Sequence, residues 1–100
     1  MNEKEKNLVE TALKEGKGLT VITGNNGTGK TTMLKEIEEM AKKENKDCLF
    51  LDVDSHCQLN QSKLKEFADD LIKESKAKNI FIVSLRKEII DIADVLIELK

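Results

Sequence analysis

A glycine-rich run limits what this 100-residue chain can fold into more than any other feature of its sequence. Residues 24–31 read Gly-Asn-Asn-Gly-Thr-Gly-Lys-Thr and fit the spacing G-x-x-x-x-G-K-[ST]. Glycines let the backbone wrap inward, so that successive N–H groups converge on one anion, and a following helix adds the positive end of its dipole. The run therefore predicts a phosphate-binding loop.

The segments on either side of the run have the pattern that such a loop requires. The β-branched stretch at 19–23 predicts a short buried strand. A helix from Lys30 to about Asn45 follows, and its apolar face is formed by Met33, Leu34, Ile37, Met40 and Ala41. A strand before and a helix after favour the phosphate loop over a flexible glycine turn.

We expect the loop and the first turn of its helix to bind a nucleoside triphosphate with Mg²⁺. Lys30 supplies a positive charge for the outer phosphates, and the hydroxyl of Thr31 is a hard oxygen ligand for Mg²⁺. The base stays open between ATP and GTP, because no aromatic residue precedes the loop and no Asn-Lys-x-Asp run is present. The predicted nucleotide-binding residues are Gly24, Asn25, Asn26, Gly27, Thr28, Gly29, Lys30, Thr31 and Thr32.

Size and composition predict one soluble domain over residues 1–100. A net charge of -2 gives no general attraction to nucleic acid or to anionic membranes. The sequence has no apolar run near the ~20 residues that span a bilayer, and its charged start is unlike a signal peptide, so we expect a cytoplasmic protein. Cys48 and Cys57 lack the spacing of a zinc site and are predicted to be free thiols.

Helical and strand patterns alternate along the rest of the chain. Helices are predicted at 3–15, around 64–72 and at 87–92, and apolar strands at 48–53, 80–84 and 95–99. Alternation of this kind implies right-handed crossovers and a parallel sheet. We therefore expect an α/β fold of three layers, similar to a P-loop NTPase, with about four parallel strands and helices on both faces.

Asp52 is the candidate for the acidic residue that Mg²⁺ needs opposite Thr31. It ends the apolar strand at 48–53, and ligands of open α/β sheets bind at the carboxyl ends of strands. Asp54 projects from the same side if the strand continues. The alternative for either aspartate is that it caps the following turn. With Lys30, Asp52 is also the predicted catalytic residue.

No single residue stands out as the group that orients an attacking water. Val53 cannot do proton chemistry. His56 lies in the loop that follows, where a lone histidine is more often solvent exposed. Ser84 ends a strand beside the expected γ-phosphate, and Arg86 could clamp phosphate oxygens or be a surface residue at a helix start.

These residues together resemble P-loop NTPases over nearly the whole chain. "KEGKGLTVITGNNGTGKTTMLKEI" is similar to the opening of AAA-type ATPases, and "NIFIVSLRKEIIDIADVLIELK" is similar to the end of ATP-binding-cassette and chromosome-maintenance ATPases. In that alignment "LFLDVD" is the Walker B strand. Val53 replaces the catalytic glutamate, Leu85 replaces the switch histidine, and the insert expected between Met40 and Cys48 is missing.

A rival alignment resembles the partition and septum-site ATPases. Their second strand carries Asp-x-Asp, as "LFLDVDSHCQLN" does here, although their extra loop lysine is replaced by Asn25. The two alignments agree on residues 24–32 and Asp52, and they differ in strand order and in whether hydrolysis is retained.

Two functions therefore stay open, and a small-molecule kinase ranks behind both. One is an ATPase with weak or partner-dependent hydrolysis, completed by Arg86 or by a group from a second subunit. The other is a regulatory module that binds nucleotide without turnover and acts through a protein partner.

Overall fold

The computed structural model describes residues 2–24, 29–52 and 61–99. The predictions for Asn25 to Thr28, and for Val53, Asp54, His56 and Cys57, lie outside these residues. The elements alternate along the chain as α1 (Glu3–Glu15), β1 (Gly18–Gly24), α2 (Lys30–Lys43), β2 (Cys48–Asp52), α3 (Gln61–Ser75), β3 (Asn79–Val83), α4 (Lys87–Ile90) and β4 (Val95–Leu99).

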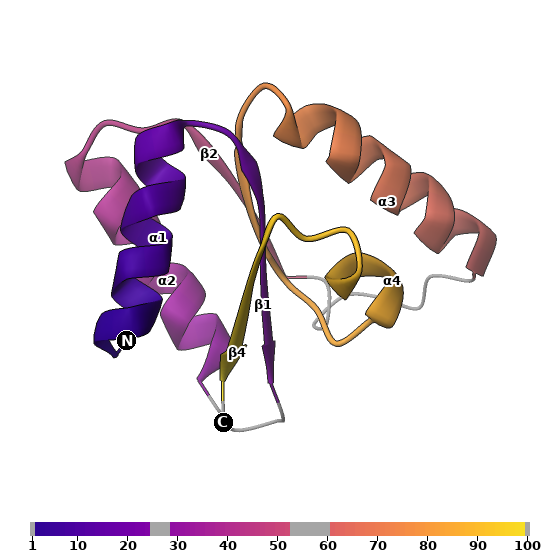
Figure 1. Cartoon of the computed structure of the whole chain (residues 1–100), viewed down its shortest axis with the longest axis horizontal. Helices are drawn as coiled ribbons and strands as arrows, with labels where there is room; N and C mark the ends of the chain where they lie inside the picture. The colour runs from indigo at the N-terminus through magenta and orange to yellow at the C-terminus, as the bar shows by residue number, and fades with distance from the viewer. Residues whose placement is uncertain (1, 25–28, 53–60, 100) are drawn as a thin grey trace.

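The strands form one four-stranded parallel sheet in the order β2-β3-β1-β4. α1 and α2 cover one face and α3 and α4 cover the other, as Figure 1 shows. The predicted α/β fold, with a parallel sheet between two helical layers, is confirmed. It is the arrangement of a P-loop NTPase-like core.

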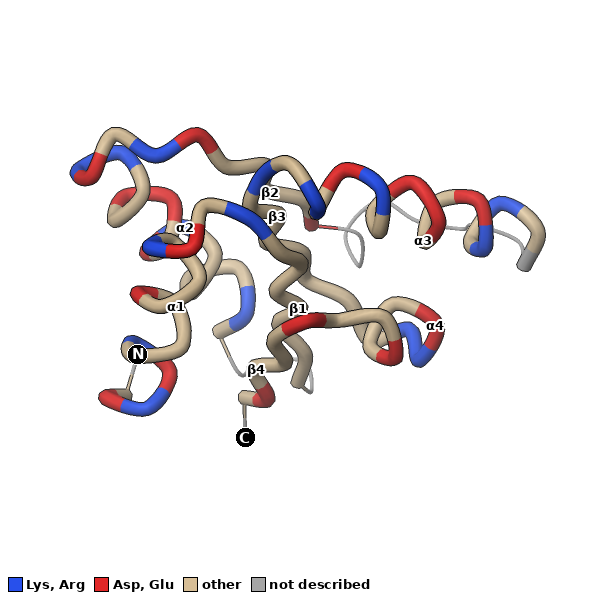
Figure 2. The backbone as a smooth tube through the Cα atoms, turned by 45° about the horizontal axis from the view of Figure 1, so that its top comes forward, with Lys and Arg blue, Asp and Glu red and all other residues tan. Residues whose placement is uncertain are grey.

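Two apolar cores hold these layers together, one on each face of the sheet. The first joins α1 and α2 to the sheet through residues that include Leu13, Ile37 and Phe81. The second joins α3 and α4 to the opposite face through residues that include Leu71 and Ile89. Alternate residues of β1 serve the two cores, because successive side chains of a strand point to opposite faces. Charged residues therefore lie along the helices, and the strands are largely uncharged (Figure 2).

The sheet register brings the carboxyl ends of three strands to one edge. Ile22 of β1 lies opposite Val83 of β3, and Val83 lies opposite Asp52 of β2. Gly24 at the end of β1 and Asp52 at the end of β2 therefore lie at the same end of the sheet, with β3 between their strands.

The ends of some elements differ from the prediction. α2 ends at Lys43 instead of about Asn45, because Asn45 adopts the left-handed conformation with φ 59°. The Asn45 N–H then bonds Lys42 O at 3.2 Å and the Lys46 N–H bonds Ala41 O at 2.8 Å. This is the Schellman pattern that ends helices. α4 is also shorter than predicted and ends at Ile90.

Ile72 has the helical spacing of the apolar face of α3, but the residue is 37% exposed. None of the helices in the described parts of the chain has both the length and the apolar character needed to cross a membrane.

Candidate functional site

At the start of α2, the last glycine of the glycine-rich run has a backbone conformation that favours glycine. Gly29 is the N-cap residue, and its φ of 85° lies in the left-handed region that disfavours side chains. A Cβ placed at Gly29 would meet no atom within 4 Å. Glycine is therefore favoured at this position by the positive φ and not by steric contact with neighbouring atoms.

The first turn of α2 is also suited to an anion. It contains no acidic residue, and its N-cap makes no side-chain hydrogen bond to the helix. α1, by contrast, begins with a capping box between Asn2 and Glu5 and carries Glu3 in its first turn. A helix start that uses no side chain as its cap leaves backbone N–H groups for a bound phosphate.

A hydrogen bond from Lys30 connects the two ends of the loop. The Lys30 ammonium nitrogen donates a hydrogen bond to the backbone carbonyl of Gly24 at 2.9 Å. The half-buried lysine thus reaches back from the first residue of α2 to the last residue of β1. This position puts its positive charge beside the loop in which phosphates were predicted to bind.

Thr31 and Asp52 are brought together from separate elements, as their predicted metal role requires. Thr31 Oγ1 donates to Asp52 Oδ2 across 3.3 Å, although the residues are 21 positions apart. Mg²⁺ is held by oxygen ligands at 2.0–2.1 Å, so two neighbouring ligands of one ion lie about 3 Å apart. A hydroxyl and a carboxylate at this separation therefore fit Mg²⁺ in both chemistry and spacing. Thr32, the next predicted residue, is exposed on the same helix.

Ser84 lies directly after β3, at the same end of the sheet. Its side chain is fully buried, and its N–H donates to Ile22 O at 3.1 Å. Ser84 Oγ accepts a hydrogen bond from the Arg86 N–H at 3.0 Å. The serine that was expected near the γ-phosphate is thus held at this edge by backbone groups. This contact could not be predicted from the sequence, because it depends on how the chain turns after β3.

Arg86 and Leu85 differ from the buried Ser84 that precedes them. Both are exposed, and Arg86 is the N-cap residue of α4. Among the described residues, the structure therefore joins Lys30 to Gly24 and Thr31 to Asp52, places Ser84 at the same end of the sheet, and leaves the Arg86 side chain at the surface. Within that described part of the chain, no group of three or more histidine, cysteine, aspartate or glutamate residues is placed to hold a metal. The candidate Mg²⁺ ligands are one hydroxyl and one carboxylate, which suits an ion that also binds nucleotide and water.

Comparison with known proteins adds one positive finding. Neither the search of curated proteins nor the search of solved structures gave a match. Residues 1–69 match the family described as AAA domain, and this stretch contains the glycine-rich loop, Lys30, Thr31 and Asp52. The match supports nucleotide binding in general. Because it covers more than half of the sequence, the chain belongs to the AAA domain family.

Proposed function

We propose that this chain binds ATP together with Mg²⁺ and hydrolyses it weakly, or only with the help of a partner. The observation that carries the proposal is the approach of Thr31 Oγ1 to Asp52 Oδ2 at 3.3 Å. Threonine in the first turn of α2 and aspartate at the end of β2 are one pair of oxygen ligands, suited to an ion that bridges phosphate oxygens.

The surroundings of this pair support phosphate binding. Lys30 lies one residue before Thr31, and its ammonium group contacts Gly24 O beside the loop. We infer that this ammonium exchanges the carbonyl for phosphate oxygens when nucleotide binds, because a charged acceptor makes the stronger hydrogen bond. The start of α2, which has no acidic residue in its first turn and no side-chain cap, adds the positive end of the helix dipole.

Weak hydrolysis is proposed because the sequence offers no group to orient the attacking water. Val53 follows Asp52 directly, and Leu85 follows Ser84, so neither position can accept a proton. Leu85 is also 49% exposed. We propose that a protein partner, or a second copy of this chain, supplies the missing group. The cytoplasm suits this activity and the free thiol of Cys48.

Val53 and Leu85 also favour a second candidate function, a regulatory module that binds nucleotide without turnover. In that case occupancy of the loop changes the affinity for a partner, and no phosphate is released. The two candidates share the nucleotide site and differ only in the chemical step.

Two measurements on the full chain separate these functions. Equilibrium titration with ATP and with GTP, in Mg²⁺ and in EDTA, should show binding that is tighter with Mg²⁺ and tighter for ATP. Phosphate release is then followed at protein concentrations above the measured Kd. Slow release supports the ATPase, and bound ATP that stays intact supports the module. Absence of any saturable nucleotide binding would contradict both.

A further inference from the structure

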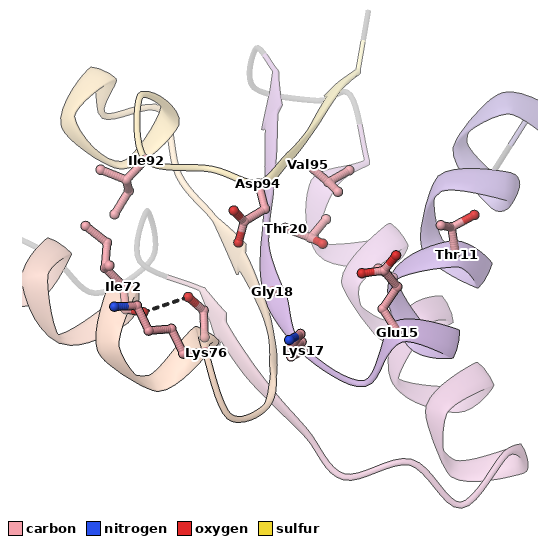
Figure 3. Close-up of a pocket in the computed structure, with 12 residues that line it drawn as sticks. Thr11, Glu15, Lys17, Gly18, Thr20, Ile72, Lys76, Ile92, Asp94 and Val95 are labelled. Carbon is pink, nitrogen blue, oxygen red and sulfur yellow. Dashed lines mark hydrogen bonds between the residues drawn. The ribbon is translucent and has the colours of Figure 1, made fainter.

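A cavity of about 470 Å³ lies at the end of the sheet opposite the nucleotide site. It is bounded by the last turns of α1 and α3 and by the beginnings of β1 and β4. Figure 3 shows Ile72 and Ile92 on one side of β1 and Thr11 and Glu15 on the other, with Asp94 and Thr20 between them. Its volume is in the range of small-molecule sites.

Thr20 gives this cavity an unmatched polar group. The residue lines the cavity and is only 1% exposed, yet Thr20 Oγ1 has no hydrogen-bond partner within the described part of the chain. The other two hydroxyls that line the cavity are used internally. Thr11 donates to Asn7 O at 2.8 Å, and Ser75 donates to Ile72 O at 2.9 Å (dashed line in Figure 3).

An unpaired buried hydroxyl costs free energy, and most buried polar groups of proteins have a partner. The Thr20 oxygen is covered in its present rotamer, but rotation about χ1 exchanges the hydroxyl with the methyl group. Because Thr20 lines the cavity, such a rotation can bring its hydroxyl to the cavity wall without moving the strand. A ligand in the cavity can then supply the missing hydrogen bond.

Asp94 provides a fixed negative charge beside Thr20. Asp94 Oδ2 accepts the Leu19 N–H at 2.8 Å, and the Asp94 N–H donates to Leu19 O at 2.8 Å. This reciprocal pair holds the carboxylate against β1, just before β4 begins at Val95. A carboxylate can accept about four hydrogen bonds, so the bond from Leu19 leaves acceptor capacity for a ligand.

The charges around the cavity favour a cation. The side chains of Glu15 and Asp94 are matched in number by those of Lys17 and Lys76. The C-terminal ends of α1 and α3 also lie here, and each adds about half a negative charge. Both lysines are exposed and carry their charges at the ends of long side chains, whereas the Asp94 carboxylate is held in place by the Leu19 N–H. The charge that is fixed at the cavity is therefore negative.

The walls set a second requirement, because Ala12, Ile72, Ile92 and Val95 are apolar. A bare metal ion would leave this surface unused, and the described residues include no cluster that would hold one. An organic cation with N–H donors uses both kinds of surface. Its ammonium group can donate to the Asp94 carboxylate and to the Thr20 hydroxyl, while its carbon chain packs on the isoleucines.

We propose that this cavity is a second ligand site that binds a small alkyl amine in its protonated form, with Asp94 and Thr20 receiving the ammonium group. The site is separate from the nucleotide site, since it lies at the amino ends of β1 and β4 whereas Gly24 and Asp52 lie at carboxyl ends of their strands. Ligand binding at this second site can therefore be tested independently of nucleotide binding.

The test is a titration of the full ¹⁵N-labelled chain with three probes of one length: pentylammonium, pentanol and pentanoate. Pentylammonium should shift the amide signals of Gly18, Leu19, Thr20 and Asp94 in a saturable way and bind at least five-fold more tightly than the other two probes. A saturable shift of equal strength with pentanoate, or no saturable shift with pentylammonium, would overturn the proposal.

Two variants then test the assigned residues. Thr20→Val keeps the shape of the side chain and removes the unpaired oxygen, and Asp94→Asn removes the charge but keeps an acceptor for the Leu19 N–H. Each should weaken pentylammonium binding about five-fold, whereas Asp91→Asn, at the exposed residue that follows α4, should bind it like the parent. Parent-like binding by either cavity variant would contradict its role.

Thr20→Val also has an expected effect without ligand. Its melting temperature should equal or exceed that of the parent, because the variant buries no unpaired hydroxyl. A lower melting temperature, or failure to fold, would show that the hydroxyl already has a structural partner and would overturn the proposal.

A lysine side chain presents the same ammonium group as a free amine. A blocked lysine, with both its α-amino and carboxyl groups capped, is therefore titrated in parallel. Tighter binding of pentylammonium assigns the cavity to free amines, and tighter binding of the blocked lysine assigns it to a lysine of another polypeptide. Either outcome supports recognition of an alkylammonium group.

Discussion

The Thr31 hydroxyl and the Asp52 carboxylate lie 3.3 Å apart, even though strand β3 separates the two strands that lead to them. If both oxygens hold the same Mg²⁺, Thr31→Val and Asp52→Asn should each weaken Mg²⁺-ATP binding about ten-fold and leave binding in EDTA nearly unchanged. The double variant should lose little more than either single one, because all three remove one shared contact. Isothermal titration measures these affinities.

Asp47→Asn is the matched control for this cycle, because Asp47 is exposed at the opposite end of β2. It should bind Mg²⁺-ATP like the parent. Fully additive losses in the double variant, or equal losses in EDTA, would mean that Thr31 and Asp52 do not share an ion.

Lys30→Met tests the lysine beside the loop. Because the ammonium is predicted to face the outer phosphates, affinity for ATP should fall more than ten-fold while affinity for AMP changes little. Competition binding with the two nucleotides measures the difference. Lys35→Met, on an exposed position of the same helix, should leave both affinities unchanged. An equal loss for ATP and AMP would place the lysine elsewhere on the nucleotide.

Gly29→Ala should lower the free energy of unfolding by about 1 kcal/mol, because alanine is strained at a φ of 85°. Gly16→Ala, at the end of α1 with a φ of 75°, should cost about as much. Neither new Cβ would meet an atom within 4 Å, so the comparison isolates backbone strain. Only Gly29→Ala should weaken ATP binding. Chemical denaturation and nucleotide titration report the two effects, and equal ATP affinity in both variants would remove Gly29 from the site.

Cys48 should make stability depend on pH in the alkaline range. Burial raises the pKa of the Cys48 thiol, and this effect outweighs the hydrogen bond from Asn79, which lowers it. In the unfolded chain the thiol loses its proton near pH 8.5. Between that pH and the higher pKa of the folded chain, the unfolded state binds fewer protons, so stability falls as pH rises. Denaturation of the parent and of Cys48→Ala from pH 7 to 10 should give a shallower decline for the variant. Parallel declines would contradict the raised pKa.

The order and type of the elements could be predicted because each has its own local signal. Apolar runs indicate the buried parallel strands, and the spacing of Gly24 from Lys30 and Thr31 indicates the loop. The position of Asp52 at the carboxyl end of a parallel strand could be predicted as well, and its role as a site residue stays a prediction. These features depend on residues that are near one another in the sequence.

The approach of Thr31 to Asp52 was expected, but other features that depend on residues distant in the sequence could not be predicted. The position of β3 between β1 and β2 is set by how the crossovers pack, and no strand carries a local mark of its neighbour. Thr20 looks like any β-branched core residue until Asp94, 74 positions later in the numbering, is placed beside the same strand. Ile72 fits the apolar face of α3 by its spacing, but it lines the cavity and is partly exposed.

The strand order has a consequence for how the molecule is made. β1 is hydrogen-bonded to β3 and β4, at residues 79–83 and 95–99, and not to β2. A ribosome adding about 5–20 residues per second exposes β1 for several seconds before either neighbour emerges. The family-matched stretch 1–69 thus contains two strands that do not pair with each other. The cost of closing the chain over such a separation comes before any gain from strand pairing, so the sheet should assemble late and in one step. The phosphate loop should therefore reach its final structure only after the last third of the sequence has been translated.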